Sequence, residues 1–218
     1  MRTPLIIAAL SLLAVDAGSA PQSATTGAVK GKVSIKGKAG GAGVVVYLED
    51  VPGTVTPPKK HAVISQREKQ FDPPLTIVVK GTTIDFPNED KIFHNVFSVS
   101  RPARFDLGLY KSGSMKSVEM KRAGTVDVYC NIHPDMIAKV KILDNGFYTI
   151  TGASGDFDIE GVPAGDYPIV AWLPSGDEAR GNVTVKAGEA AKVELALSAS
   201  DKKESHLRKD GTPYGRYK

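Results

Sequence analysis

Three of the side chains that could do chemistry in this sequence follow one another at intervals of three residues. Cys130, His133 and Met136 lie in the segment Cys-Asn-Ile-His-Pro-Asp-Met, so one short loop offers a thiolate, an imidazole and a thioether. Sulfur ligands beside imidazole suit copper, because Cu(I) prefers sulfur and Cu(II) accepts nitrogen. Two histidines and one cysteine with a weak axial methionine form the pattern of an electron-transfer copper site. The segment therefore predicts one copper ion and requires a second histidine from elsewhere.

His94 is the candidate for that second imidazole. It follows the strand-like segment 82–86 and precedes another alternating stretch, so it lies upstream of the ligand loop, as the site requires. The sequence contains four histidines, and the other two, His61 and His206, stand in polar segments. We expect both of these to face solvent and to take no part in metal binding.

The strand before the loop should aim the cysteine inward. Val126, Val128 and Cys130 alternate with polar or amphipathic neighbours, so they share one face of a strand. Cys130 is the only cysteine, and in an oxidising compartment a lone thiol is buried and inert, paired with another chain, or held as a thiolate by a metal. The histidine and methionine beside it favour the third of these alternatives.

Residues 1–20 have the features of a secretory signal peptide. Arg2 precedes an apolar run over 5–15, and small residues occupy 17–20, which predicts cleavage after Ala20 and a periplasmic location. The apolar run is too short to span a bilayer, and no later stretch reaches the length of a membrane helix. We therefore expect a mature protein without a membrane span.

Segment 54–143 resembles a cupredoxin, the blue-copper family that includes plastocyanin and amicyanin. The spacing of Cys130, His133 and Met136 is similar to the short ligand loop of amicyanin, and His94-Asn95 resembles the upstream ligand with its neighbour. The other points of similarity are Phe71-Asp-Pro-Pro74, Gly81, Asn88-Glu-Asp90 and Phe105-Asp-Leu-Gly108. The resemblance implies a Greek-key β-sandwich and gives Asn95 the task of tying the two ligand segments together. The alternative for Asn95 is an ordinary turn asparagine.

The flanking segments suggest a second β-sandwich. The stretch 155–167, which leads to Trp172, resembles the carboxypeptidase regulatory-like domain, a transthyretin-like sandwich. Gly31-Lys-Val33 and Val44-Val-Val-Tyr47 look like the first strands of that family. We therefore expect a sandwich split into 28–53 and 144–198, with the copper domain 54–143 inserted between the halves. The alternative is that the early strands belong to the copper domain itself.

Composition and charge agree with an all-β protein that has no nucleic-acid partner. Glycine, proline, valine and threonine are abundant, and apolar residues alternate over short stretches without a helical period. The net charge is +4, and the tail 199–218 supplies +3 of it through six basic and three acidic residues. A near-neutral body with a basic tail predicts a solvated, disordered end, and docking to an acidic partner is the alternative.

The function expected from these features is one-electron transfer between periplasmic redox partners, such as a cytochrome c or a dehydrogenase. The layout is similar to plastocyanin-like chains of the methylamine utilisation type, although nothing identifies an amine dehydrogenase as the partner. Multicopper oxidases and copper nitrite reductases need more histidines than the four present, so we expect no enzyme activity. The alternative function is periplasmic copper binding or trafficking with the same ligands and no redox role.

Overall fold

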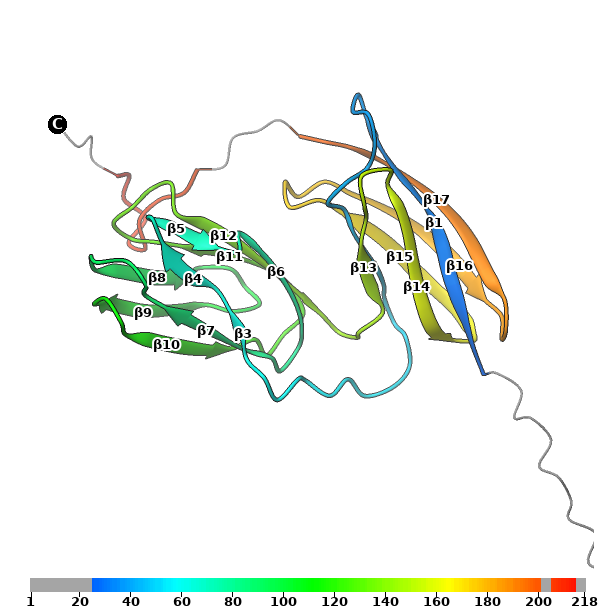
Figure 1. Ribbon diagram of the computed structural model, residues 1–218, viewed down its shortest axis with the longest axis horizontal. Helices are drawn as coiled ribbons and strands as arrows, with labels where there is room; N and C mark the ends of the chain where they lie inside the picture. The colour runs from blue at the N-terminus through cyan, green and yellow to red at the C-terminus, as the bar shows by residue number, and fades with distance from the viewer. Residues whose placement is uncertain (1–24, 201–204, 215–218) are drawn as a thin grey trace, which may run out of the picture.

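The structure is a computed structural model that describes residues 25–200 and 205–214 (Figure 1). All regular elements among these residues are β-strands, so the predicted all-β class is confirmed. No helix in the described residues is long and apolar enough to cross a membrane. The predicted signal peptide, residues 1–20, lies outside the described residues.

The first sandwich is built from the middle of the chain. Its larger sheet has the order β6-β12-β11-β8-β9, and its smaller sheet has the order β10-β7-β3. A short hairpin of β4 and β5 lies beside them. The bounds are β3 Ala62–Val63, β4 Ser65–Arg67, β5 Gln70–Asp72, β6 Leu75–Val79, β7 Thr83–Pro87, β8 His94–Ser98, β9 Phe105–Tyr110, β10 Met115–Glu119, β11 Gly124–Tyr129 and β12 Ile137–Leu143.

The alternation predicted before the ligand loop is present in β11. Val126, Val128 and Cys130 are completely buried, while Thr125, Asp127 and Tyr129 are partly exposed. The buried face packs with Phe86 of β7 and Val140 of β12 into one apolar core. Cys130 follows the last residue of β11, so its side chain enters the interior at the end of the sheet.

The second sandwich combines the start and the end of the described chain. One sheet has the order β14-β1-β17 and the other has the order β13-β2-β15-β16. The bounds are β1 Thr26–Lys36, β2 Val45–Leu48, β13 Tyr148–Ile150, β14 Asp156–Pro163, β15 Gly165–Trp172, β16 Glu178–Val185 and β17 Ala190–Ser198. β1 and β2 thus pair with strands beyond residue 147. On this pairing we propose the split arrangement, with the halves at 28–53 and 144–198 around 54–143.

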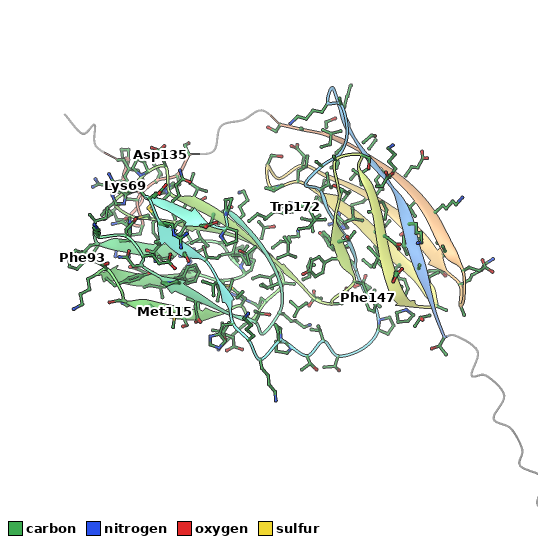
Figure 2. The ribbon with its side chains drawn as sticks, viewed as in Figure 1. Lys69, Phe93, Met115, Asp135, Phe147 and Trp172 are labelled. Carbon is green, nitrogen blue, oxygen red and sulfur yellow. The ribbon has the colours of Figure 1, made fainter. Side chains whose placement is uncertain are left out.

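Strand β2 of the sheet that faces the first sandwich is buried on both faces. In β2, Val46 and Leu48 enter the core of the second sandwich, whereas Val45 and Tyr47 face the first sandwich. Trp172 lies between the two sandwiches (Figure 2), in one cluster with Leu143 of β12. This arrangement explains why β2 reads as the continuous apolar run Val-Val-Tyr-Leu instead of an alternating strand.

Lys141 of β12 is a buried cation at that contact. Its Nζ lies 4.9 Å from the ring centroid of Tyr47 and 4.8 Å from that of Trp172. Burial lowers the pKa of Lys141, against the charges of Glu178 and Glu49, which raise it. The two rings accept the ammonium through cation–π contacts and connect the sandwiches.

The prediction of a disordered tail is wrong for residues 205–214. This segment lies against the end of the first sandwich that carries the ligand loop (Figure 1). His206, expected to face solvent, stacks on Tyr129 with ring centroids 4.1 Å apart and planes 13° apart. Charge composition suggested a solvated end because it takes no account of the two aromatic side chains, His206 and Tyr214, that anchor the segment. The tail residues 201–204 and 215–218 lie outside the described residues.

Candidate metal centre

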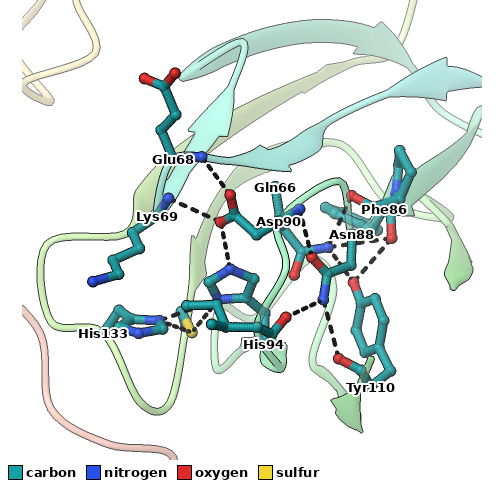
Figure 3. A network of polar contacts seen from close by, with 12 residues as sticks. Gln66, Glu68, Lys69, Phe86, Asn88, Asp90, His94, Tyr110 and His133 are labelled. Atoms are coloured by element: carbon teal, nitrogen blue, oxygen red, sulfur yellow. Dashed lines mark hydrogen bonds and ion pairs between the residues drawn. The ribbon is translucent and has the colours of Figure 1, made fainter. Parts of the chain in front are cut away.

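Three of the predicted ligands converge at one end of the first sandwich. The Nδ1 atoms of His94 and His133 are 3.1 Å apart. The Sγ atom of Cys130 lies 3.8 Å from Nδ1 of His94 and 3.6 Å from Nδ1 of His133 (Figure 3). His94 and Cys130 are completely buried and His133 is half-buried. Two imidazoles and one thiol therefore point at a common position.

Each ligand is placed by its own element. His94 is the first residue of β8, Cys130 follows β11, and His133 lies in the loop between β11 and β12. The amide of Cys130 donates to the carbonyl of Met136 at 3.3 Å, and the amide of Met136 donates to the carbonyl of His133 at 3.2 Å. These two backbone bonds fold the loop into a compact turn that brings its sulfur and imidazole together.

Met136 is completely buried in the same apolar core as Cys130. It stands immediately before β12, so its position is fixed by the sheet on one side and by the bond to His133 on the other. Its thioether as the weak fourth ligand stays a prediction.

Asp90 orients the imidazole of His94, a role that sequence reasoning did not assign. Its Oδ2 lies 2.7 Å from Nε2 of His94 (Figure 3). Because a carboxylate only accepts hydrogen bonds, Nε2 of His94 donates to Asp90, and the neutral ring therefore presents the lone pair of Nδ1 to Cys130 and His133. A carboxylate behind a ligating histidine is a common way to fix the tautomer and the direction of the ring. The signal available in the sequence was an acidic residue four positions before His94.

The hairpin between β4 and β5 holds Asp90 in turn. The amide of Glu68 donates to its Oδ1 at 2.7 Å and the amide of Lys69 donates to its Oδ2 at 2.9 Å. Glu68 and Lys69 have φ of 53° and 57°, the left-handed region that turns their amides toward the carboxylate. Burial alone would raise the pKa of Asp90, but these hydrogen bonds and the one from His94 lower it.

A buried polar network supports the segment that carries Asp90. Asn88 donates to the carbonyls of Ile92 at 2.9 Å and Tyr110 at 3.1 Å, and its Oδ1 accepts the amide of Asp90 at 3.0 Å. The hydroxyl of Tyr110 donates to the carbonyl of Phe86 at 2.9 Å, and burial raises its pKa well above the ordinary value. Gln66 joins the network as a donor to Tyr110 (Figure 3). The loop before His94 is therefore fixed from the core side.

The surroundings favour a thiolate at Cys130. Burial alone would raise its pKa, but a hydrogen bond from the protonated form of His94 and those from the backbone amides of Ile132, Asn95 and His133 lower the pKa below the ordinary value. Burial alone would lower the pKa of His94, but the hydrogen bonds of this ring with Cys130 and Asp90 raise the pKa above the ordinary value. The pKa of His133 is lowered by burial and by the positive charge of His94.

Asn95 contacts both ligand segments, through two different groups. Its side-chain amide donates to Oδ1 of Asp106 in β9 at 2.7 Å, and its backbone amide is one of the groups that lower the pKa of Cys130. The link across to the cysteine is thus made by the main chain, because the side chain is engaged by Asp106. The structural role of Asn95 beside a bound metal stays a prediction.

His61 lies outside the centre. Its Nδ1 is 2.9 Å from Oδ1 of Asp85, and its side chain is 47% exposed. It is partnered by a surface carboxylate of β7, in agreement with its placement in a polar segment.

The donor set fits a copper ion. The one cluster of metal-binding type in the described residues consists of His94, Cys130 and His133, whose donor atoms all lie within 4.8 Å of one another. It contains no carboxylate ligand, which argues against magnesium, calcium or manganese. A lone pair at Nδ1 of His94 and a thiol with a lowered pKa are the forms in which these groups bind a metal.

Comparison with known proteins gives structural similarity only. No family model matches the chain, and no curated protein matches it. Among solved structures, a purple cupredoxin from Nitrosopumilus maritimus is 20% identical, with 37% of this chain and 98% of that chain covered and a TM-score of 0.34. A copper(I) form of an amicyanin variant is 23% identical, with 44% and 97% covered and a TM-score of 0.36.

A copper-containing nitrite reductase from Thermus scotoductus SA-01 is also similar. It is 20% identical, with 42% of this chain covered and a TM-score of 0.37. The similarity spans 24% of the length of that reductase. Each of these three structures is similar to less than half of this chain.

Proposed function

We propose that the protein is a type 1 copper protein that transfers single electrons between redox partners. The observation that carries the proposal is the convergence of His94 Nδ1, Cys130 Sγ and His133 Nδ1 at the end of the first sandwich. When bound there, copper would supply a one-electron couple between Cu(I) and Cu(II). His94, Cys130 and His133 would hold it, with Met136 as the weak axial ligand.

The support around the ligands favours electron transfer over copper trafficking. Asp90 locks one imidazole, and the end of β11 locks the thiol, so little rearrangement would accompany a change of oxidation state. A trafficking protein needs ligands that release the ion readily, and two of the three donors here are completely buried. A preorganised, buried site is the arrangement expected of a carrier.

Half-buried His133 is the ligand through which we propose that electrons leave. Its neighbours Pro134 and Asp135 are exposed, so this part of the loop faces possible partners. The partners would be periplasmic redox proteins such as a cytochrome c or a dehydrogenase, and the protein itself would not be an enzyme. A periplasmic location follows from the predicted signal peptide. We also propose that the second sandwich is a carboxypeptidase regulatory-like domain, because segment 155–167 resembles that family.

Optical and electron paramagnetic resonance spectra of the copper-loaded protein test the proposal. Cu(II) should give an intense visible band from thiolate-to-copper charge transfer, and Cys130→Ser should abolish that band because the thiolate is its source. Met120→Leu, a change in the same core that leaves the ligand set intact, should keep it. A copper-saturated wild-type protein without colour would contradict the proposal of an electron carrier and would favour copper binding or trafficking instead.

A further inference from the structure

The C-terminal segment returns to the candidate metal centre from the far sandwich. β17 ends at Ser198 in the second sandwich, whereas residues 205–214 lie beside β11 and β12 at the ligand end of the first (Figure 1). We call residues 205–214 the strap. The strap contributes no strand to the sheets of either sandwich.

The strap is hydrogen-bonded to two successive residues of the ligand loop. The hydroxyl of Tyr214 donates to the carbonyl of Cys130 at 2.6 Å. The backbone amide of Lys209 donates to Oδ1 of Asn131 at 2.9 Å. Cys130 and Asn131 lie just beyond the end of β11, where ladder pairing stops, so the strap supplies contacts that the sheet does not.

The strap is also connected, through Asp106, to the segment that carries His94. Nζ of Lys209 lies 2.6 Å from Oδ2 of Asp106, the carboxylate whose Oδ1 accepts the side chain of Asn95. Asn95 follows His94 in β8. Lys209 thus joins the two segments from which the ligands come.

Aromatic contacts of His206 add to the hydrogen bonds that Lys209 and Tyr214 make with the ligand loop. The ring of His206 stacks on Tyr129 at 4.1 Å and meets the ring of Tyr214 edge-on at 5.1 Å. Phe97 of β8 lies 6.2 Å from the same imidazole. Tyr129 precedes Cys130, so the stack covers the residue immediately before the thiol ligand.

We propose that the strap is a latch that holds the ligand loop 130–136 in its metal-binding form, with Tyr214 as the positioning residue. It keeps the loop closed before the metal arrives and slows the release of the metal afterwards. The second effect rests on the proposed function, whereas the first is a property of the metal-free protein. Tyr214 touches the carbonyl of Cys130 and not its sulfur, so it acts through the backbone.

Reaction of the Cys130 thiol with a disulfide reagent measures the latch without metal. The thiol is completely buried, so labelling of the folded protein requires the loop to open. Loss of one net hydrogen bond changes an opening equilibrium by about fivefold. Tyr214→Phe should therefore label about five times faster than the wild-type protein, and the double change His206→Ala with Tyr214→Ala should label faster still.

Tyr148→Phe is the matched control, because it removes a hydroxyl from a half-buried tyrosine in β13, away from the ligand loop. Its labelling rate should equal that of the wild-type protein. Circular dichroism should show that all variants keep their strand content. Equal labelling rates for Tyr214→Phe, the double variant and the wild type would overturn the latch.

Copper-loaded protein supplies the second measurement. Both strap variants should release copper to a chelator faster than the wild type, and the energy or intensity of the charge-transfer band should change. Unchanged release and an unchanged band would contradict a positioning role at the metal. If the wild-type protein binds no copper, the proposed function fails, but the labelling experiment still decides the latch.

Discussion

The interiors of the two sandwiches differ in composition. The core of the second sandwich is formed by valine, leucine, isoleucine and alanine together with Phe157 and Tyr167. The first sandwich instead buries polar side chains beside its apolar core, namely Gln66, Thr82, Asn88, His94, Asn95 and Ser98. Burial of polar groups lowers stability unless they are hydrogen-bonded. The second interior is almost entirely apolar, whereas four of the polar side chains buried in the first, Gln66, Asn88, His94 and Asn95, belong to the network around the candidate metal centre.

The difference teaches where chemistry and stability reside in the molecule. The network of Asn88, Tyr110 and Asp90 converges on His94, whereas the buried Thr151 of the second sandwich bonds only the backbone of neighbouring turns. Changes in the second core should therefore alter stability without altering the metal centre, and changes around His94 should do the reverse.

The largest expected effect is on the stability of the second core. Leu48→Ala removes a side chain that is 1% exposed and should lower the free energy of unfolding by about 2–5 kcal/mol. The charge-transfer band of the copper-loaded protein should not move. Ile150→Ala, at an exposed position of the same sheet, should cost far less in a denaturant titration. A shifted band in Leu48→Ala would show that the two interiors are coupled.

Removal of the carboxylate behind His94 should act on the metal instead. Oδ2 of Asp90 accepts from both His94 and the amide of Lys69, which an amide nitrogen cannot do. Asp90→Asn should lower copper affinity by about 10–100-fold in a competition titration against a chelator. Glu89→Gln changes the neighbouring carboxylate, which pairs with Arg67 at the surface, and should leave the affinity unchanged. Equal copper affinities for the two variants would show that Asp90 does not support the metal centre.

A smaller effect is expected at the predicted axial ligand. Met136→Leu replaces one buried apolar side chain by another of similar volume, so the protein should fold and keep its copper. The reduction potential should shift, because a weak axial thioether tunes the couple more than it holds the ion. Met120→Leu, in the same core, should leave the potential unchanged. Complete loss of copper from Met136→Leu would show that the thioether is an essential ligand.

The smallest effect concerns the contact between the sandwiches. Because burial lowers the pKa of Lys141 below 10.5, the unfolded chain binds more protons than the folded one just below that pH. The free energy of unfolding should therefore rise slightly as the pH approaches 10.5 from below.

Lys141→Met provides the reference for this measurement, since it should lack that rise. Glu49, Glu178 and Arg180 are the charged groups that act on Lys141, and they are common to both proteins. Burial raises the pKa of Tyr47 to about 12, which opposes the rise at higher pH, so measurements above pH 10 should be avoided. Identical pH profiles for the two proteins would show that Lys141 is as well solvated as in the unfolded chain.

The sequence was sufficient for the parts of the site that depend on local pattern. The alternation before Cys130 predicted which residues of β11 face inward, and residue type predicted the cluster of His94, Cys130 and His133. Strand periodicity is a property of consecutive residues, so it can be read directly.

Contacts between distant segments could not be read in the same way. Asp90 was visible as an acidic residue, but its role depends on the hairpin at Glu68 and Lys69, whose amides hold it. The strap was misjudged because its charges suggested solvation, whereas Tyr214 and His206 find partners more than seventy residues away in the sequence. Long-range pairing of this kind leaves no periodic signal.

The parallel pairing of β1 with β17 also limits when the second sandwich can be completed. β1 is the central strand of its sheet, and its neighbours are β14 and β17, both made much later. A chain is synthesised from its N-terminus, so both partners of β1 become available only after the first sandwich has been synthesised. The sheet that contains β1 therefore cannot be completed until β17, the last of the described strands, is available.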